Sequence, residues 1–386
     1  TRLPLLVTGR IRTLAEAEQI IRSGEADLVG MTRAHIADPH IVRKTLEGDP
    51  DDVRPCIGCN HGCIGGLLTL GRIGCTVNPA VGLEASLSED LIEPAAAPKS
   101  VLVVGGGPAG LEAARIAARR GHRVTLAEAM PHVGGGAVVA ALAPRRTGIG
   151  DIVHWLEREV RRLGVDVRLN TYIEAEDVHS LNPDVVIVAT GSLPRVDGRQ
   201  HLRPGLQPTG MDLPHVVSSI DVLTQGRGRN WGQTALVFDD AGDHVALQAA
   251  EVLAQAGAKV EVMTPDRSFS PEVMGMNLVP YVRALQPMGV TFTVTWRLRS
   301  VRRDGNRLVA TVGSDYGAAV QERHVDQVVV NHGTVPLDDL YFALKPLSSN
   351  RGEVDHAALI AGRPQAIAAN ADGTFQLFRI GDAVSA

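Results

Sequence analysis

The sequence predicts an α/β fold in which two Rossmann-like dinucleotide-binding units follow a short segment that contains cysteines. Three observations predict it. Strand and helix patterns alternate from Ser100 onward, Gly-x-Gly-x-x-Gly stands between a predicted strand and a predicted helix at Gly105–Gly110, and the four cysteines all fall between Cys56 and Cys75. Strands that alternate with helices are typical of a parallel sheet, because each parallel strand needs a crossover connection.

The first fifty residues have the pattern of two strand–helix units. In order, the predicted elements are a strand Leu5–Val7 ending in Thr8-Gly9-Arg10, a helix Leu14–Arg22, a strand Ala26–Met31 ending in Thr32-Arg33, and a helix from Asp38-Pro39 through Lys44. Two such units cannot bury their apolar faces alone. We therefore expect them to be the end of a larger (β/α) structure that begins before this chain.

The α/β pattern continues to the end of the chain. Predicted strands are Val101–Val104, Arg123–Ala127, Asp184–Ala189, Thr234–Phe238, Lys259–Met263, Val290–Thr295, Leu308–Val312, Val325–Val330 and Phe375–Gly381. Predicted helices are Pro108–Arg120, Ile149–Leu163 and His244–Gln255. The units that begin at Val101 and Thr234 resemble each other, and the stretch Glu93–Pro98 is a predicted linker.

Composition narrows the class of protein. The chain has 386 residues, 44% of them apolar, which is enough for two or three domains with their own cores. Its net charge is −5 without a basic run, so we expect neither nucleic acid nor an anionic membrane as a partner. Thr1–Arg12 lacks the features of a signal peptide, and no apolar run approaches the roughly 18 residues of a spanning helix. We expect a cytoplasmic protein and a homo-oligomer.

The cysteines Cys56, Cys59, Cys63 and Cys75 have the spacing C-x2-C-x3-C-x11-C. Their clustering argues for metal binding, because disulfide bonds normally spread through a small secreted domain. Four thiolates can hold a 4Fe–4S cluster with one cysteine per iron. A structural zinc site is the alternative, although zinc sites usually use two pairs of similar spacing, and free thiols are a third. His61 lies within the loop, where we expect a surface residue or one behind the ligands.

The pattern Gly105-Gly-Gly107-Pro108-Ala109-Gly110 predicts a nucleotide site. Its first glycine allows the tight turn, the second lets a diphosphate approach the backbone, and the third allows close packing of helix and strand. Glu128 ends the next strand eighteen residues later, where an acid should bind the ribose hydroxyls. Thr190-Gly191 and Gly381-Asp382 end two further strands and favour FAD. For Asp382 alone, a helix cap is the alternative.

The second α/β unit departs from this pattern. At the three glycine positions the chain has Asp239, Ala241 and His244. Side chains would fill the phosphate cradle, and the nearby carboxylates would repel a diphosphate. We expect NAD(P)H to bind here weakly or not at all.

Together these residues resemble the two-part iron–sulfur flavoenzymes typified by trimethylamine dehydrogenase, histamine dehydrogenase and 2,4-dienoyl-CoA reductase. The resemblance covers the whole chain. It rests on Gly9-Arg10, Ala26–Val29, Arg33, Ile36–Pro39, Cys56–Cys63, Cys75–Pro79, Gly105–Gly110 and Gly381-Asp382. The cysteine spacing is similar to that of the reductase branch. The second loop, which lacks the three glycines, is similar to that of the amine dehydrogenases. Asn331–Pro336 and Tyr341–Pro346 are similar to demethylases of dimethylglycine or N-methylproline.

The resemblance implies four parts of the chain. These are the end of an FMN-binding TIM barrel at 1–50, a 4Fe–4S segment and linker at 51–95, an FAD- or ADP-binding domain at 96–228 plus 331–386, and a degenerate nucleotide-binding domain at 229–330. It also implies that Gly9, Arg10, Thr32 and Arg33 hold the FMN phosphate, which suits the last loops of such a barrel. Solvated loop arginines are the alternative. The catalytic residues are expected in the barrel, before Thr1.

The implied function is an amine dehydrogenase or N-demethylase that passes electrons from FMN through the cluster to a protein such as electron-transferring flavoprotein. The substrate is then a small amine. Two alternatives remain open. One is an NAD(P)H-dependent reductase of enoyl thioesters, with electrons flowing the other way. The other is a non-catalytic electron-transfer module.

Overall fold

A computed structural model of the chain describes residues 3–385. The chain forms two compact units, and each is described by itself. Unit 1 comprises the described parts of Thr1–Val138, Gly148–Gly191 and Asp338–Val384. Unit 2 comprises Val139–Thr147 and Ser192–Leu337, with the described end of the chain. The domain boundaries drawn from the nucleotide-binding motifs stay a prediction.

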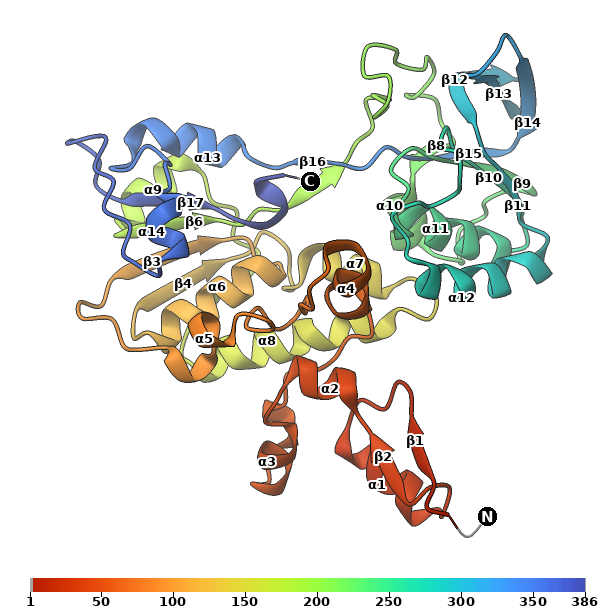
Figure 1. Cartoon of the computed structure of the whole chain (residues 1–386). Helices are drawn as coiled ribbons and strands as arrows, with labels where there is room; N and C mark the ends of the chain where they lie inside the picture. The colour runs from red at the N-terminus through yellow and green to blue at the C-terminus, as the bar shows by residue number, and fades with distance from the viewer. Residues whose placement is uncertain (1–2, 386) are drawn as a thin grey trace. The chain divides into compact units, whose positions relative to one another are not determined.

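The N-terminal strands pair in parallel. β1 (Leu6–Thr8) lies beside β2 (Leu28–Gly30) in the register Thr8↔Gly30, and α1 (Leu14–Arg22) connects them (Figure 1). α1 begins after a capping box, in which Thr13 and Glu16 each accept the other's backbone N–H. The two predicted strand–helix units are therefore present. The barrel that they were assigned to stays a prediction.

The chain after β2 differs from the prediction. Thr32 and Arg33 were placed at the end of a strand, but they begin a separate helix, α2 (Thr32–Ala37). The next helix, α3 (Ile41–Leu46), does not open at Asp38. Asp38 is extended instead, because the residue before a proline is disfavoured in the α region.

Unit 1 contains a five-stranded parallel sheet in the order β17-β6-β3-β4-β5. The strands are β3 (Ser100–Val104), β4 (Arg123–Ala127), β5 (Asp166–Arg168), β6 (Val185–Val188) and β17 (Gln376–Arg379). The C-terminal strand β17 thus returns to the sheet beside β6. The parallel α/β prediction is confirmed here, although β5 was not predicted, because two of its three residues, Asp166 and Arg168, are charged.

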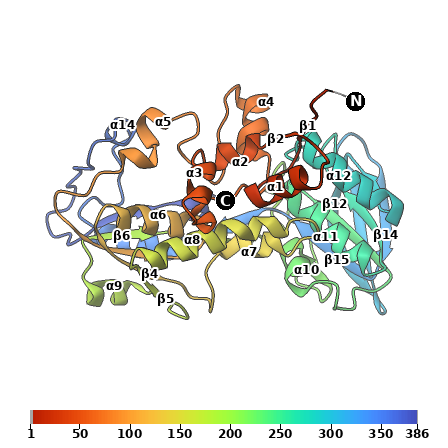
Figure 2. The ribbon, with the colours of Figure 1, turned by 90° about the horizontal axis from the view of Figure 1, so that it is seen from below.

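Helices cover both faces of this sheet (Figures 1 and 2). Val101 and Val103 of β3 share a core with α6 (Pro108–Arg119) and α8 (Gly150–Arg162). Leu102 belongs to the core on the other face, with α9 (Ala175–Leu181) and α13 (Asp339–Leu344). Successive residues of a strand point to opposite faces, so a strand buried on both faces is apolar throughout.

Unit 2 contains a second five-stranded parallel sheet, in the order β11-β10-β9-β15-β8. Its strands are β8 (Val216–Ser218), β9 (Thr234–Asp239), β10 (Lys259–Met263), β11 (Thr291–Thr293) and β15 (Gln327–Asn331). As in unit 1, the first strand of the βαβ unit lies between the second strand and a strand from later in the chain. This arrangement leaves a crevice at the carboxyl ends of the strands, where α/β proteins bind ligands.

The two faces of this sheet are covered differently. Val237 packs against helices, which are α10 (Ser219–Gln225), α11 (His244–Gln255) and α12 (Gly275–Leu285). Phe238 packs against an antiparallel sheet, which consists of β12 (Trp296–Asp304), β13 (Arg307–Ser314) and β14 (Val320–Val325). Only part of β13 was predicted. β7 (Ser192–Pro194) and β16 (Thr334–Pro336) form a further antiparallel pair.

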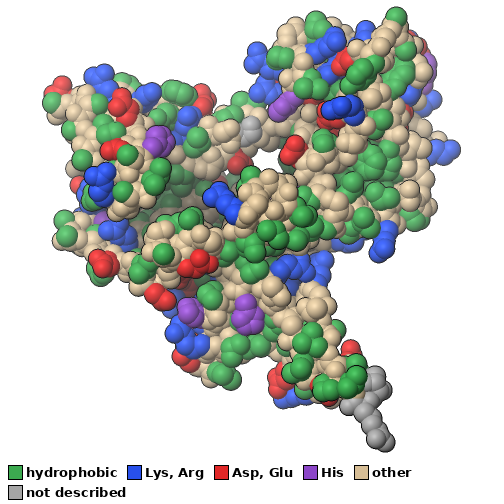
Figure 3. All heavy atoms as spheres, viewed as in Figure 1, with side chains coloured by type: hydrophobic (Ala, Val, Ile, Leu, Met, Phe, Trp, Pro, Cys, Tyr) green, Lys and Arg blue, Asp and Glu red, His purple; other side chains and the backbone are tan. Residues whose placement is uncertain are grey.

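Short helices occupy the connections. They are α4 (Gly66–Leu70), α5 (Glu84–Leu87), α7 (Gly135–Ala141), α14 (His356–Ile360), the π-helical turn η2 (His61–Gly65) and the 3-10 turns η1 (Pro50–Asp52), η3 (Glu89–Leu91), η4 (Thr147–Ile149), η5 (Gln286–Met288), η6 (Lys345–Leu347) and η7 (Gly381–Ala383). Among residues 3–385, every helix is too short or too polar to cross a membrane. On the face drawn in Figure 3, Lys and Arg side chains occur in small groups among acidic and apolar ones.

Candidate cofactor-binding sites

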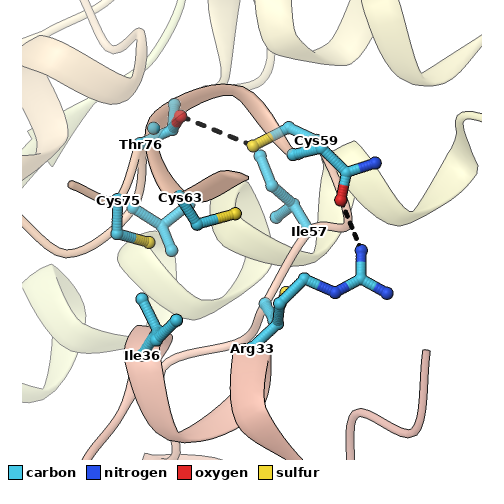
Figure 4. A pocket seen from close by; sticks show the side chains of 11 residues that line it. Arg33, Ile36, Ile57, Cys59, Cys63, Cys75 and Thr76 are labelled. Carbon is cyan, nitrogen blue, oxygen red and sulfur yellow. Dashed lines mark hydrogen bonds between the residues drawn. The ribbon is translucent and has the colours of Figure 1, made fainter. Parts of the chain in front are cut away.

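The four cysteines line one pocket in unit 1. Cys56 and Cys59 lie in the loop before η2, Cys63 lies within η2, and Cys75 lies in the loop that follows α4. Figure 4 shows Cys59, Cys63 and Cys75 with their sulfur atoms directed into the pocket, and Ile36 and Ile57 along its wall. Thr76 Oγ1 lies 3.4 Å from the Cys59 Sγ. Residues nineteen positions apart are therefore brought around one small space.

A glycine permits this approach. A β-carbon on Gly62 would lie 2.9 Å from the backbone N of Cys75, a distance at which the backbone would have to move. The Gly74 N–H also donates to the Gly62 carbonyl oxygen at 2.7 Å. Before this contact the chain turns at Gly58 and Asn60, which have φ values of 67° and 61°. Glycine and asparagine are the residues that adopt this left-handed conformation most readily.

Burial and hydrogen bonding have opposite effects on the pKa of two of the cysteine thiols, Cys56 and Cys75. Burial raises the pKa of the Cys56 and Cys75 thiols, while hydrogen bonds from the Gly58 N–H to Cys56 and from the Val77 and Asn78 N–H groups to Cys75 oppose the rise. The charge of Arg33 also favours the Cys56 thiolate. Backbone donors of this kind are among the factors that set the potential of an iron–sulfur cluster. His61 is exposed and does not line the pocket.

The predicted phosphate residues lie at one edge of the β1–β2 pair. Gly9 and Arg10 follow β1, and Thr32 follows β2, so the parallel register Thr8↔Gly30 brings them to the same end. Gly9 and Arg10 both have positive φ, at 139° and 57°. Arg33 is different, because its guanidinium donates to the Asn60 Oδ1 at 2.5 Å and lines the cysteine pocket (Figure 4).

The three glycines of the Gly-x-Gly-x-x-Gly pattern, Gly105, Gly107 and Gly110, have different surroundings. A β-carbon on Gly105 would lie 2.2 Å from the Ala189 carbonyl oxygen, and one on Gly110 would lie 2.0 Å from the Gly105 carbonyl oxygen. These two positions need glycine for close packing within the protein. A β-carbon on Gly107 would meet nothing within 4 Å. The open space at Gly107 is where a diphosphate would approach the backbone, at the start of α6 with Pro108 in its first turn.

The other predicted nucleotide residues surround this loop. Gly105 lies against the chain that leads into Thr190 and Gly191. Gly381 lies close to Ala109, since a β-carbon on Gly381 would be 2.9 Å from the Ala109 β-carbon. Segments from three distant parts of the sequence are thus brought to one edge of the sheet. Asp382 is exposed in the turn η7, whose cap is Ile380, so Asp382 does not act as a helix cap.

Glu128 is held beside the loop by its own backbone contacts. One carboxylate oxygen accepts the Gly106 N–H at 2.7 Å, and the other accepts the Met130 N–H at 2.8 Å. The carboxylate is therefore fixed at the end of β4. Each oxygen keeps a second lone pair, so contact with ribose hydroxyls stays a prediction.

The second nucleotide loop is filled by its own side chains. The Asp239 carboxylate accepts the Gly242 N–H at 2.9 Å and the Asn331 side-chain amide at 3.0 Å. The same amide also donates to Asp243, at 2.9 Å, and Asp243 caps α11. Burial raises the pKa of Asp239 to about 7. A carboxyl group therefore occupies a backbone donor that a diphosphate would need. A cavity of about 200 Å³ remains nearby, lined partly by Ser218, Asp243 and Asn331.

Within unit 1, a buried ion network holds the cysteine segment against α6 and α8, and sequence patterns did not reveal it. Arg54 donates to the Val77 carbonyl oxygen at 2.5 Å, forms an ion pair with Glu89 at 2.6 Å and stacks over Trp155 at 4.3 Å. Arg115 is 1% exposed and pairs with the same Glu89 carboxylate at 2.6 Å. The only sequence feature that pointed to this network was the position of Arg54, two residues before Cys56. The partners lie too far apart in sequence to form a pattern.

Comparison with known proteins places the chain in a family. The profile of the pyridine nucleotide-disulphide oxidoreductase family matches residues 99–358. The chain belongs to this family. Membership implies a flavin-dependent oxidoreductase with parallel, Rossmann-like sheets, as the structure has them.

Curated relatives confirm the narrower resemblance to the iron–sulfur flavoenzymes. The chain is 51% identical over 386 residues to a probable N-methylproline demethylase of Rhizobium meliloti, covering 100% of this chain and 55% of the relative. It is 40% identical over 389 residues to an N,N-dimethylglycine/sarcosine dehydrogenase of Chromohalobacter salexigens, covering 98% of this chain and 55% of the relative. The chain thus spans about half the length of the curated relatives it matches.

Two solved structures of amine-oxidising enzymes are similar to this chain over nearly its whole length. The chain superimposes on a 6-hydroxypseudooxynicotine amine oxidase of Pseudomonas geniculata with a TM-score of 0.84 and 32% identity, covering 100% of this chain and 54% of that one. It superimposes on histamine dehydrogenase of a Rhizobium species with a TM-score of 0.82 and 28% identity, covering 99% and 53% of the two chains. These structures are similar over both units.

Proposed function

We propose that this chain is the electron-transfer part of an iron–sulfur flavoprotein that dehydrogenates or demethylates a small amine. The observation that carries the proposal is the position of the four cysteines around one pocket, in the same compact unit as the open Gly107 cradle. A cluster pocket and a nucleotide cradle in one unit provide the parts of an electron-transfer chain. The demethylase and dehydrogenase named above are consistent with an amine as the substrate of the whole protein.

The residues around the pocket fit a 4Fe–4S cluster better than a single zinc ion. Zinc requires its sulfur ligands about 2.3 Å from one point. The four cysteines have the spacing C-x2-C-x3-C-x11-C, without the two pairs of similar spacing that are usual at zinc sites. A cluster takes one cysteine per iron, so its ligands stand further apart around a larger group. Cys56, Cys59, Cys63 and Cys75 would hold the cluster.

We propose sites for the other cofactors as well. Gly105, Gly107, Gly110 and Glu128 would hold the ADP part of FAD, or ADP alone. Thr190, Gly191, Gly381 and Asp382 would lie near the rest of the nucleotide. Gly9, Arg10, Thr32 and Arg33 would contact the FMN phosphate, with β1 and β2 as part of an FMN-binding barrel. We assign the amine site and its catalytic residues to that barrel.

When bound, a 4Fe–4S cluster supplies one-electron transfer, which can link a two-electron flavin to a one-electron acceptor. We infer a protein acceptor such as electron-transferring flavoprotein. The cysteine loop serves this role by holding four thiolates in a partly buried pocket. The Gly58, Val77 and Asn78 N–H groups stabilise the charge on those sulfurs.

A second candidate is a reductase that uses NAD(P)H. Its support is a 40% identity over 262 residues to an NADH oxidase of Thermoanaerobacter brockii, covering 68% of this chain and 39% of the relative. The filled second loop argues against it, because Asp239 and Asp243 occupy the donors of the phosphate cradle. The third candidate, a module without catalysis of its own, describes the chain if it binds its cofactors but converts no amine.

The chain purified without oxygen tests the proposal. We expect about four irons and four acid-labile sulfides per chain, an electron paramagnetic resonance signal after dithionite, and FAD or ADP in an acid extract. Zinc without iron would overturn the redox assignment. NADPH should not reduce the chain, whereas rapid reduction would favour the reductase. Turnover of dimethylglycine or N-methylproline by this chain alone would contradict its role as an electron-transfer part.

A further inference from the structure

Arg33 contacts the cysteine loop through a neutral partner. Its guanidinium donates to the Asn60 Oδ1 at 2.5 Å and lines the pocket together with Cys56 and Cys59. Among residues 3–385, Arg33 forms no ion pair within 4.0 Å. A guanidinium stays protonated throughout the pH range of a folded protein. The pocket wall therefore carries a positive charge that is not paired with a carboxylate of the described residues.

Two other arginines donate to backbone carbonyl oxygens at or near the cysteines, and both are paired with a carboxylate. Arg12 donates to the Cys56 carbonyl oxygen at 3.1 Å and pairs with Asp151 at 2.9 Å. Arg54 donates to the Val77 carbonyl oxygen and pairs with Glu89 at 2.6 Å. These two hold the backbone in place but add little net charge. Of the three, Arg33 supplies the uncompensated charge at the pocket.

The partner of Arg33 also shapes the loop. Asn60 adopts a left-handed conformation with φ of 61°, directly between Cys59 and η2, which contains Cys63. Its carbonyl oxygen at the start of η2 accepts the Gly65 N–H at 3.0 Å. A hydrogen bond to its side chain therefore acts on the residue at which the chain turns from one cysteine to the next.

We propose that Arg33 is a positioning residue that holds the Asn60 turn and raises the reduction potential of the cluster bound by the four cysteines. The inference rests on the proposed function, since it requires a cluster. Reduction adds one electron, and so one negative charge, to a group already bound by four thiolates. A nearby positive charge favours that reduced state, because the partly buried pocket screens the attraction less than bulk water does.

The same arginine follows β2, at the edge that we propose for the FMN phosphate. A single side chain would then contribute to both cofactor sites, so the titration is done without added FMN, whose phosphate would offset the charge of Arg33. This gives Arg33 a role that the phosphate assignment alone does not contain.

The experiment is a redox titration of the anaerobically purified full chain, followed by electron paramagnetic resonance. Arg33→Gln removes the charge, and Asn60→Asp keeps Arg33 but neutralises it with a residue that tolerates the left-handed turn. Both should make the cluster harder to reduce, by about tenfold in the equilibrium constant or 59 mV for one electron. Arg33→Lys, which keeps the charge, should change the potential less.

Arg22→Gln is the matched control, because Arg22 is exposed and paired with Glu18 in the same N-terminal segment. It should leave the potential unchanged. If Arg33→Gln loses iron, Asn60→Asp still tests the charge, and the iron loss supports the positioning role. An unchanged potential in an iron-loaded Asn60→Asp variant would overturn the inference. Absence of iron in the unmodified chain would instead overturn the proposed function.

Discussion

Gly62 lies so close to Cys75 that a β-carbon on Gly62 would be 2.9 Å from the Cys75 backbone nitrogen. This contact joins the loop of the first three cysteines to the loop of the fourth. Glycine therefore acts here through its lack of a side chain, since its φ is not in the left-handed region. The completeness of the cysteine pocket depends on this approach.

We predict that Gly62→Ala loses iron. The added methyl group would push the Cys75 loop away, so the fourth sulfur would no longer complete the site, and iron per chain should fall by half or more. Gly74→Ala is the matched control in the same loop, because its β-carbon would be 3.6 Å from the Gly62 carbonyl oxygen, an ordinary contact. Iron and sulfide assays after anaerobic purification measure both. Equal iron in the two variants would contradict the packing argument.

We predict that alanine at Gly107 and alanine at Gly105 have different effects. Gly107→Ala should fold normally and bind nucleotide at least tenfold more weakly, since its methyl group enters the space for the diphosphate. Gly105→Ala should lower the melting temperature, because its methyl group would meet the Ala189 carbonyl oxygen and its φ of 107° disfavours a side chain.

Nucleotide content and thermal unfolding separate these two effects. Gly228→Ala is the control, since its β-carbon would meet nothing within 4 Å and it lies outside the loop. Weaker binding by Gly107→Ala together with a lost fold would mean that this position has a packing role after all.

We predict that the buried Asp239 lowers stability at neutral pH. Its pKa is raised from 3.8 to about 7, so the folded chain holds a proton there that the unfolded chain releases. The free energy of unfolding is therefore unaffected by this ionisation below pH 3.8. It falls as the pH rises from 3.8, and the loss is complete above about pH 7. Asp239→Asn should be more stable at pH 8, by up to about 4 kcal/mol. Asp212→Asn, at an exposed aspartate, is the control.

Urea unfolding of unit 2 in the whole chain, between pH 4.5 and 8, measures this effect. The difference between the variant and the unmodified chain should shrink as the pH falls. A difference that does not change with pH would show that hydrogen bonding, and not ionisation, determines the effect.

We predict the opposite dependence for Glu89. Burial alone would raise its pKa, but Arg115, Arg54 and Arg119 outweigh burial and lower the pKa from 4.5 to about 2. Its contribution to stability is present above pH 4.5 and lost as the pH falls through 2. Glu89→Gln should cost roughly 1–3 kcal/mol at pH 7, less than a fully buried pair because water screens the carboxylate.

Chemical unfolding between pH 2 and 7 measures the loss. Glu157→Gln is the control, because Glu157 pairs with Arg161 on the surface of α8 and such pairs contribute less than about 1 kcal/mol. If Glu89→Gln were no more destabilising than Glu157→Gln, the network would not hold the cysteine segment in place.

Much of the fold followed from local pattern. The helix Leu14–Arg22 and the strand Lys259–Met263 were predicted with the bounds that the structure has. Helices and strands with a clear period of apolar residues can be found in this way. The strand β5 and the antiparallel strands β12 and β14 were missed. Charged residues at exposed positions of β5, β12 and β14 disguise the apolar pattern of these strands.

The candidate sites were predictable to the extent that their chemistry depends on neighbours in sequence. Glycine at Gly105, Gly107 and Gly110, and cysteine at the four thiol positions, form patterns of residue type and spacing. They can be read without knowing what lies across the fold. The grouping of Gly9, Arg10, Thr32 and Arg33 was instead implied by the family resemblance, and the parallel pairing of β1 with β2 brings Gly9, Arg10 and Thr32 to one edge.

Three features depended on the tertiary structure. Packing directs Arg33 to Asn60, fills the second phosphate cradle with Asp239 and Asp243, and brings Gly381 against Ala109. Each joins segments whose contact depends on how helices and sheets pack, and no local spacing encodes that. Residue type determines what a side chain can bind, whereas the fold selects which of its possible partners is within reach.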